Sequence, residues 1–167
     1  MRPNAPTELT IIKPRLLRQE FEFISAGQPV GKLKISGPLK MAAQATLFNE
    51  EWSLIRSGFW QTFIEYKAAQ KPFIKGKIQK KMRGKTELKA SDGKIYTFRK
   101  TKWWKSSWAW YDRNENPVIE MRQDHSFTNK QAYFIIHNPH QAEATLMILI
   151  GWFVILIQRR NAAAAAA

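Results

Sequence analysis

Most of the chain alternates between apolar and polar positions over short stretches that turn residues separate. In residues 20–35, Glu20–Ser25 alternates, Ala26–Pro29 supplies a turn, and Val30–Ile35 alternates again. An alternation of period two is typical of a half-buried β-strand, and two such stretches joined by a short turn predict a β-hairpin. Residues 20–35 are therefore predicted to form a β-hairpin.

The same pattern returns four more times. The first apolar residue after each turn follows the previous one by about 22 residues, so a strand recurs roughly every 11 residues, as in β-sandwiches and barrels. With an entry strand at Leu9–Ile12 and a last strand at Ala132–Ile136, we expect roughly ten to twelve strands. The further hairpins are predicted within residues 46–55, 63–78, 87–98 and 108–121.

The C-terminal stretch breaks the alternation. Within residues 144–157 only Thr145 is polar, and from Leu146 onward every residue is apolar or glycine. A helix of this composition has no polar face, so protein or lipid must enclose it on all sides. Apolar runs of 10 to 14 residues are more often core helices than membrane spans, which need about 20 residues. We predict a core helix over about residues 142–158, in which Gly151 indicates a close approach to a strand.

The strands need an apolar element to surround, and the helix needs an apolar enclosure. We therefore predict an all-β fold, a closed antiparallel barrel of roughly twelve strands around the C-terminal hydrophobic helix. Residues 8–160 are expected to form a single domain, with a flexible N-terminus at residues 1–7. Residues 161–167, mostly alanine, are taken as a tail of artificial origin.

Composition and charge narrow the function. The 167 residues include no cysteine, which excludes disulfide frameworks and cysteine nucleophiles. The formal net charge is +14, and residues 71–105 carry 13 basic residues against Glu87 and Asp92. A field of this strength favours an anionic membrane surface or a nucleic acid as partner. The alternative is a solvated basic face that keeps the protein soluble.

An aromatic and basic segment lies within this region. Trp108 and Trp110 share one face of a predicted strand and are expected to pack in the core, whereas Trp103 and Trp104 lie on opposite faces. Tryptophan beside lysine is typical of a membrane–water boundary, although bases of a single-stranded nucleic acid also stack on such rings. The candidate residues for binding an anionic lipid or a partner are Lys75, Lys77, Lys80, Lys81, Arg83, Lys85, Lys100, Lys102, Trp103, Trp104 and Lys105.

Catalytic and metal motifs are weak. His137 and His140 flank Pro139, which forbids a regular helix between them, and no carboxylate lies close by in sequence. Asp124-His125-Ser126 holds the residue types of a hydrolase triad, but sequence neighbours cannot adopt that geometry together. We predict no enzymatic activity, no metal and no cofactor.

The arrangement of these elements resembles the tubby C-terminal-like fold, in its LURP-one-related and phospholipid-scramblase-like branches. The resemblance rests on paired aromatic-rich strands, on the turn Asp112–Asn116, and on the apolar helix Leu146–Ile157. It implies a barrel around a central C-terminal helix and non-enzymatic work at anionic lipids. The chain lacks a cysteine for a palmitoyl anchor and an acidic calcium-loop pattern, so the resemblance does not extend to scramblase activity.

The sequence therefore predicts a non-enzymatic protein that binds an anionic membrane surface or a protein partner through residues 71–105. No apolar signal segment follows Met1, so we expect a cytoplasmic protein or a peripheral one at the inner face of a membrane. One alternative is a tail-anchored protein or accessory subunit of a membrane complex, with residues 144–157 in lipid. The other is a nucleic-acid-binding barrel.

Overall fold

The computed structural model describes residues 8–37, 41–58, 62–71, 75–79, 84–102, 105–125, 128–137 and 143–167. Within these ranges twelve strands precede a single helix, in agreement with the predicted all-β character and C-terminal helix. The elements are β1 (Glu8–Ile12), β2 (Glu20–Ser25), β3 (Gln28–Ser36), β4 (Ala42–Leu47), β5 (Glu50–Ser57), β6 (Phe63–Ala68), β7 (Lys75–Gln79), β8 (Thr86–Lys89), β9 (Ile95–Lys100), β10 (Ser107–Tyr111), β11 (Pro117–Gln123), β12 (Lys130–Ile136) and α1 (Ala144–Ala165).

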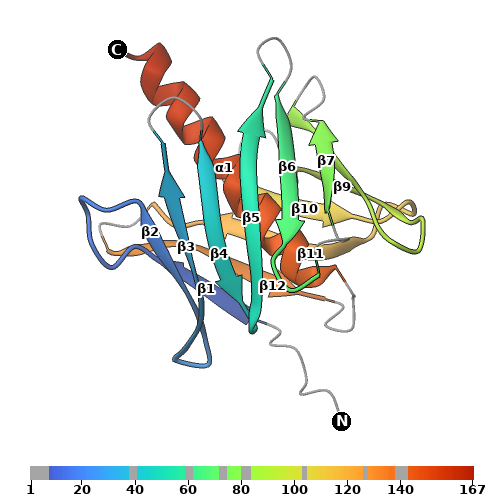
Figure 1. Cartoon of the computed structure of the whole chain (residues 1–167), viewed down its shortest axis with the longest axis horizontal. Helices are drawn as coiled ribbons and strands as arrows, with labels where there is room; N and C mark the ends of the chain where they lie inside the picture. The colour runs from blue at the N-terminus through green and yellow to red at the C-terminus, as the bar shows by residue number, and fades with distance from the viewer. Residues whose placement is uncertain are drawn as a thin grey trace.

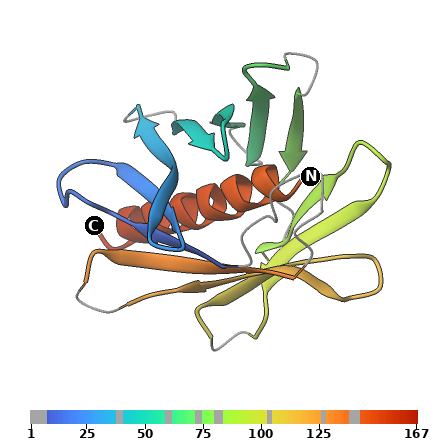
Figure 2. The same ribbon diagram turned by 90° about the horizontal axis from the view of Figure 1, so that it is seen from below.

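The strands form one antiparallel sheet in the order β7-β6-β5-β4-β3-β2-β1-β12-β11-β10-β9-β8. Each predicted hairpin is present, since consecutive strands pair along the chain on both sides of β1 and β12. The pairing of β1 with β12, in which Leu9 lies opposite Phe134, joins the two halves. Figures 1 and 2 show the sheet curving around α1.

The edges of this sheet are β7 and β8, which follow each other in the chain. Cα atoms of β7 and β8 approach within 8 Å, but no hydrogen-bonded ladder joins the two strands within the described residues. The structure thus confirms a curved antiparallel sheet with a C-terminal helix, while the sheet is not closed into a barrel within the described residues.

The core lies between the concave face of the sheet and α1. Alternate strand residues supply it, as in β2, where Phe21 and Phe23 are buried and the positions beside them are not. Every residue of α1 from Ala144 to Ile157 is buried. Ile150 and Phe153 are completely inaccessible, in agreement with the core helix predicted over about residues 142–158. Since each large apolar side chain contributes about 1.5–3 kcal/mol on full burial, this helix is a major source of stability.

The predicted close approach at Gly151 is also confirmed. A Cβ atom at this position would lie 3.2 Å from the Phe98 ring and 3.2 Å from Trp110 Nε1. Trp108 and Trp110 are both buried, as predicted, and the ring centroids of Phe98 and Trp108 lie 5.4 Å apart. The absence of a side chain at Gly151 lets α1 lie directly against these rings.

The helix begins close to the predicted residue and ends later than predicted. It continues through Asn161 and the alanines to Ala165, because alanine is the best helix-forming residue. The predicted flexible segment, residues 1–7, lies outside the described residues.

Candidate functional site

An antiparallel meander places its connections alternately at two ends of the sheet. The connections β1–β2, β3–β4, β5–β6, β7–β8, β9–β10 and β11–β12 lie at one end, and the others, with the start of α1, lie at the opposite end. The C-terminal part of α1 returns to the first end, because Arg159 contacts Gln123 and Gln131, and Arg160 contacts the Gly37 carbonyl oxygen. We call the first end the basic rim and the second end the opposite rim.

The basic rim collects most of the excess positive charge. Acidic residues in its described connections and their flanking strand ends are limited to Glu20 and Asp124. Glu20 lies 3.7 Å from the Lys34 ammonium group. Ten basic residues of the described ranges lie at the same rim, namely Lys13, Arg15, Arg18, Lys85, Lys100, Lys102, Lys105, Lys130, Arg159 and Arg160.

The opposite rim is close to neutral when its charged residues are counted in the same way. Its described connections, their flanking strand ends and the residue before α1 carry five basic and six acidic residues. The acidic residues are Glu8, Glu50, Asp92, Asp112, Glu115 and Glu143, and the basic ones are Lys71, Lys75, Lys89, Lys94 and Arg113. The molecule is therefore electrically polarised along α1.

This topology divides the predicted basic face of residues 71–105. Lys85, Lys100, Lys102 and Lys105 come together at the basic rim, whereas Lys75 begins β7 at the opposite rim. Lys77 lies within β7, opposite Glu65 in the ladder with β6. The side chains of Lys75 and Lys77 lie outside the described part of the chain, as do the residues Lys80, Lys81, Arg83, Trp103 and Trp104 in full.

Arg159 is a half-buried cation of the basic rim. Its guanidinium group donates to Gln123 Oε1 at 3.1 Å and to Gln131 Oε1 at 2.9 Å, and it lies 5.0 Å from the Trp152 ring centroid. Burial lowers the pKa of Arg159, and neither hydrogen-bond acceptor carries a negative charge. A half-buried cation held by neutral amides keeps its attraction for an external anion.

A hollow of about 500 Å³ lies beside Arg159. Lys13 and Arg160 also line it, together with Phe21 and Leu156, and its lining includes no carboxylate. Its size and charge suit an anionic group with an apolar neighbour.

A hydrogen bond of 2.8 Å joins His125 Nε2 and Ser106 Oγ, and so ties the β11–β12 connection to the β9–β10 connection. A Ser–His pair is one component of nucleophilic catalysis, but a third group must orient the imidazole. Within the described residues His125 has no carboxylate partner, and Ser106 and His125 are both exposed. The pair acts as a link between two connections.

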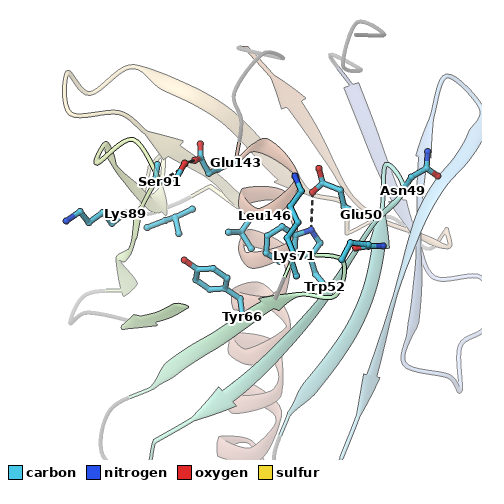
Figure 3. Close-up of a pocket in the computed structure, with 13 residues that line it drawn as sticks. Asn49, Glu50, Trp52, Tyr66, Lys71, Lys89, Ser91, Glu143 and Leu146 are labelled. Atoms are coloured by element: carbon cyan, nitrogen blue, oxygen red, sulfur yellow. Dashed lines mark hydrogen bonds between the residues drawn. The ribbon is translucent and has the colours of Figure 1, made fainter. Parts of the chain in front are cut away.

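The opposite rim holds a larger cavity, of about 730 Å³ (Figure 3). Trp52, Tyr66, Leu88 and Leu146 supply its apolar walls. The Tyr66 hydroxyl points toward the interior of the cavity (Figure 3), and no hydrogen-bond partner for it is found among the described residues. Burial, and then the charge of Glu143, raise the pKa of Tyr66. Its phenol group stays protonated and can donate a hydrogen bond to a small amphipathic molecule.

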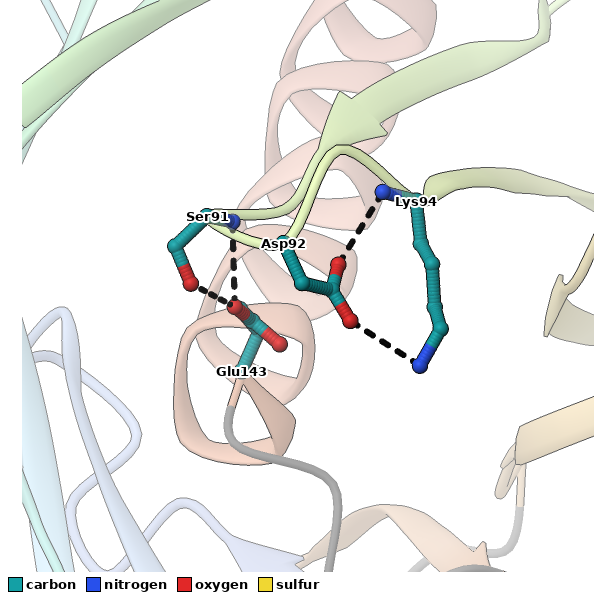
Figure 4. A network of polar contacts seen from close by, with 4 residues as sticks. All are labelled: Ser91, Asp92, Lys94 and Glu143. Carbon is teal, nitrogen blue, oxygen red and sulfur yellow. Dashed lines mark hydrogen bonds and ion pairs between the residues drawn. The ribbon is translucent and has the colours of Figure 1, made fainter.

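Two carboxylates that line this cavity are held in position by hydrogen bonds. Glu50 Oε2 accepts a hydrogen bond of 3.1 Å from the Trp52 indole. Glu143, directly before α1, accepts bonds from the Ser91 backbone N–H at 3.2 Å and from the Ser91 hydroxyl at 2.8 Å. Figure 4 shows this contact beside the ion pair of Asp92 with Lys94. The negative charge of Glu143 lies favourably at the positive end of the helix dipole.

The histidines give no metal centre in the described ranges. His137 Nε2 lies 3.2 Å from Glu120 Oε2, and His140 is outside those ranges. The described residues hold no group of three or more histidine, cysteine, aspartate or glutamate side chains placed to bind a metal ion. The absence of a metal and a cofactor remains a prediction.

Sequence reasoning missed three features: Arg159 as an enclosed cation, the contribution of residues 13–18 to the basic rim, and the cavity. The strand order could have revealed the second, because connections two strands apart lie at the same end of a meander. Arg159 lies on α1 and is outside this pattern. The cavity had no such signal, since it joins residues from β5, β6, β8 and α1.

Comparison of the chain with protein-family models, curated proteins and solved structures finds no match.

Proposed function

We propose that the protein is a non-enzymatic binding protein that docks its basic rim on an anionic phospholipid membrane. The observation that carries the proposal is the concentration, among the described residues, of ten basic side chains against two acidic ones at one end of the sheet. Near an anionic surface each lysine or arginine contributes about 1 kcal/mol. The distribution over several connections suits an extended surface better than a single small ligand.

The enclosed environment of Arg159 adds to this support. A lipid phosphate that entered the hollow beside it would meet Lys13 and Arg160 as well. Hydrogen bonds between a guanidinium group and a phosphate are strong because both partners are charged.

A tail anchor is the less favoured function. By length and composition α1 could cross a membrane. Its residues from Ala144 to Ile157 are buried against the sheet, however, and their transfer to lipid would expose the apolar concave face to water. This exposure would cost the stabilisation that the core provides.

The proposal includes a tubby-like architecture, in which β7 and β8 complete a barrel around α1. Three observations support it: the curvature of the sheet around α1 (Figure 2), the approach of β7 to β8, and the position of the apolar helix after all the strands. An amide hydrogen-exchange measurement on β7 and β8 tests closure, since edge amides exchange rapidly and paired ones are protected.

Sedimentation with vesicles tests the docking function. The parent protein should bind phosphatidylcholine vesicles that contain phosphatidylserine, bind pure phosphatidylcholine poorly, and lose affinity as salt rises. The variant Lys85→Glu/Lys102→Glu/Lys105→Glu should bind at least about 100-fold more weakly at 0.1 M salt, because three attractions become repulsions. All three side chains are exposed, so folding should be unaffected.

A variant of the opposite rim provides the matched control. Lys71→Glu/Lys89→Glu/Arg113→Glu makes the same change in net charge with three exposed residues and should retain most of the binding. Equal losses in both variants would show that only net charge matters and would refute docking through the basic rim. A parent protein that ignores acidic vesicles but binds oligonucleotides would replace the membrane with a nucleic acid as partner.

A further inference from the structure

The connection between β1 and β2 exposes two adjacent leucines at the basic rim. The Arg18 backbone N–H donates to the Arg15 carbonyl oxygen at 3.2 Å and closes a β-turn with Leu16 and Leu17 at its two central positions. Leu16 is 82% exposed and Leu17 is 99% exposed. The turn thus presents both side chains to solvent.

This exposure is unusual. Central turn positions favour glycine, proline, asparagine and aspartate. Elsewhere in the described residues the only exposed large hydrophobic residue is Ile55, at 40%. Single exposed apolar residues are common on protein surfaces, but Leu16 and Leu17 are neighbours on one projecting turn, and Arg15 and Arg18 flank them directly.

Both ends of the connection are attached to the rim. The Lys13 backbone N–H donates to the Asn129 carbonyl oxygen at 2.8 Å, and the Ile35 N–H donates to the Gln19 carbonyl oxygen at 2.9 Å. In Figures 1 and 2 the connection projects away from the sheet. Because its base is fixed, presentation of the two leucines requires little further ordering.

We infer that Leu16 and Leu17 form a membrane-inserting tip, which enters the acyl region of an anionic bilayer while Arg15 and Arg18 bind lipid phosphates. This inference rests on the proposed function and deepens it. Arginines keep their charged groups at the headgroup level while adjacent apolar side chains lie deeper. The partner is a bilayer because the apolar tip projects from the rim whose described part carries ten basic residues, and anionic lipids offer both negative headgroups and a hydrocarbon interior.

With an inserting tip, vesicle binding has an electrostatic component and a hydrophobic component, which salt affects differently. Attraction between charges is screened by salt, whereas burial of leucine in hydrocarbon is not. The parent protein should therefore retain part of its vesicle binding at 0.5 M salt. Leu16→Ser/Leu17→Ser should bind acidic vesicles roughly 100-fold more weakly at 0.1 M salt, and lose the salt-resistant part, since each buried leucine contributes about tenfold or more.

A site-specific probe reports insertion directly. The chain has no cysteine, so Leu17→Cys creates a unique attachment site for an environment-sensitive fluorophore. Its emission should shift to the blue on vesicles that contain phosphatidylserine, and lipids with nitroxide-labelled acyl chains should quench it. Arg113→Cys, on the β10–β11 turn of the opposite rim, should show neither effect.

The outcomes distinguish the inference from the function on which it rests. If the labelled protein binds acidic vesicles while its probe stays in water, or if the double serine variant binds as well as the parent, the inserting tip is refuted and docking through charge stands. If the parent binds no acidic vesicles, both are refuted.

Discussion

The indole N–H of Trp110 donates a hydrogen bond to the Met147 carbonyl oxygen across 2.8 Å and so joins β10 to the first turn of α1. Trp108 lies two positions earlier and is also buried, but its indole N–H has no hydrogen-bond partner in the described part of the chain. Two tryptophans on one face of one strand therefore differ in whether the indole N–H is hydrogen-bonded.

Trp110→Phe should destabilise the protein more than Trp108→Phe. Both substitutions remove similar volume from the core, but the first also removes a buried hydrogen bond, and the second removes an unpaired donor. The difference should be about 1–2 kcal/mol in the free energy of unfolding. Urea denaturation of the two variants measures it, and equal losses would show that the bond to Met147 contributes nothing.

Ile150→Lys should prevent soluble folding. Ile150 is completely buried, and an unpaired ammonium group at this position has no compensating partner. Ile150→Val is the control, because it removes one methylene group and should cost about 1 kcal/mol. Soluble expression and circular dichroism provide the measurement. A well-folded lysine variant would contradict the position of α1 in the core.

Gly31→Ala should be severely destabilising. A Cβ atom there would lie 2.2 Å from the Thr46 carbonyl oxygen and 2.8 Å from the Leu47 Cα, which are backbone atoms of the neighbouring strand. Because these backbone atoms cannot move without disturbing the hydrogen bonds between β3 and β4, we expect the free energy of unfolding to fall by about 3 kcal/mol or more. Gly93→Ala meets open space at φ +83° and should cost only about 1–2 kcal/mol. Thermal unfolding of the pair tests this order.

Asp112 should make stability sensitive to acid. The Asn116 backbone N–H, then the Asn116 side chain and the Asn114 N–H, lower the pKa of Asp112 through hydrogen bonds. Its contribution is therefore complete above the unfolded-state pKa of about 4 and is lost as pH falls through the lowered pKa. Because the carboxylate is near solvent, this contribution should be below about 1 kcal/mol.

Urea unfolding between pH 7 and pH 2 tests this effect with Asp112→Ala. The variant should be less stable than the parent at pH 7, and the difference should shrink toward pH 2. A constant difference would show that the carboxylate charge has no role in the turn.

The strands and the core helix could be predicted because they depend on local patterns. Alternation and turn residues located the hairpins, such as the one around Asp92 and Gly93, and an apolar run without a polar face placed residues 146–157 in the core. The pairing of β1 with β12 could not be derived this way, since Leu9 and its partner Phe134 are separated by most of the chain.

The distribution of charge was only partly predictable. Lys71 and Lys85 are close in sequence but lie at opposite rims, because one strand separates them. Arg18 and Lys105 are distant in sequence and lie at the same rim. Local charge density identified the basic character of the surface, while the topology decided which lysines act together.

The order of elements along the chain has a consequence for biosynthesis. The helix that fills the concave face of the sheet follows all twelve strands, and a ribosome adds about 5–20 residues per second. Until α1 emerges, the apolar faces of the strands have no helix to pack against. The pairing of β1 with β12 also cannot form until β12 has been synthesised. A nascent chain that ends before residue 143 should therefore depend on chaperones and remain sensitive to protease, and release of the last helix should trigger cooperative folding.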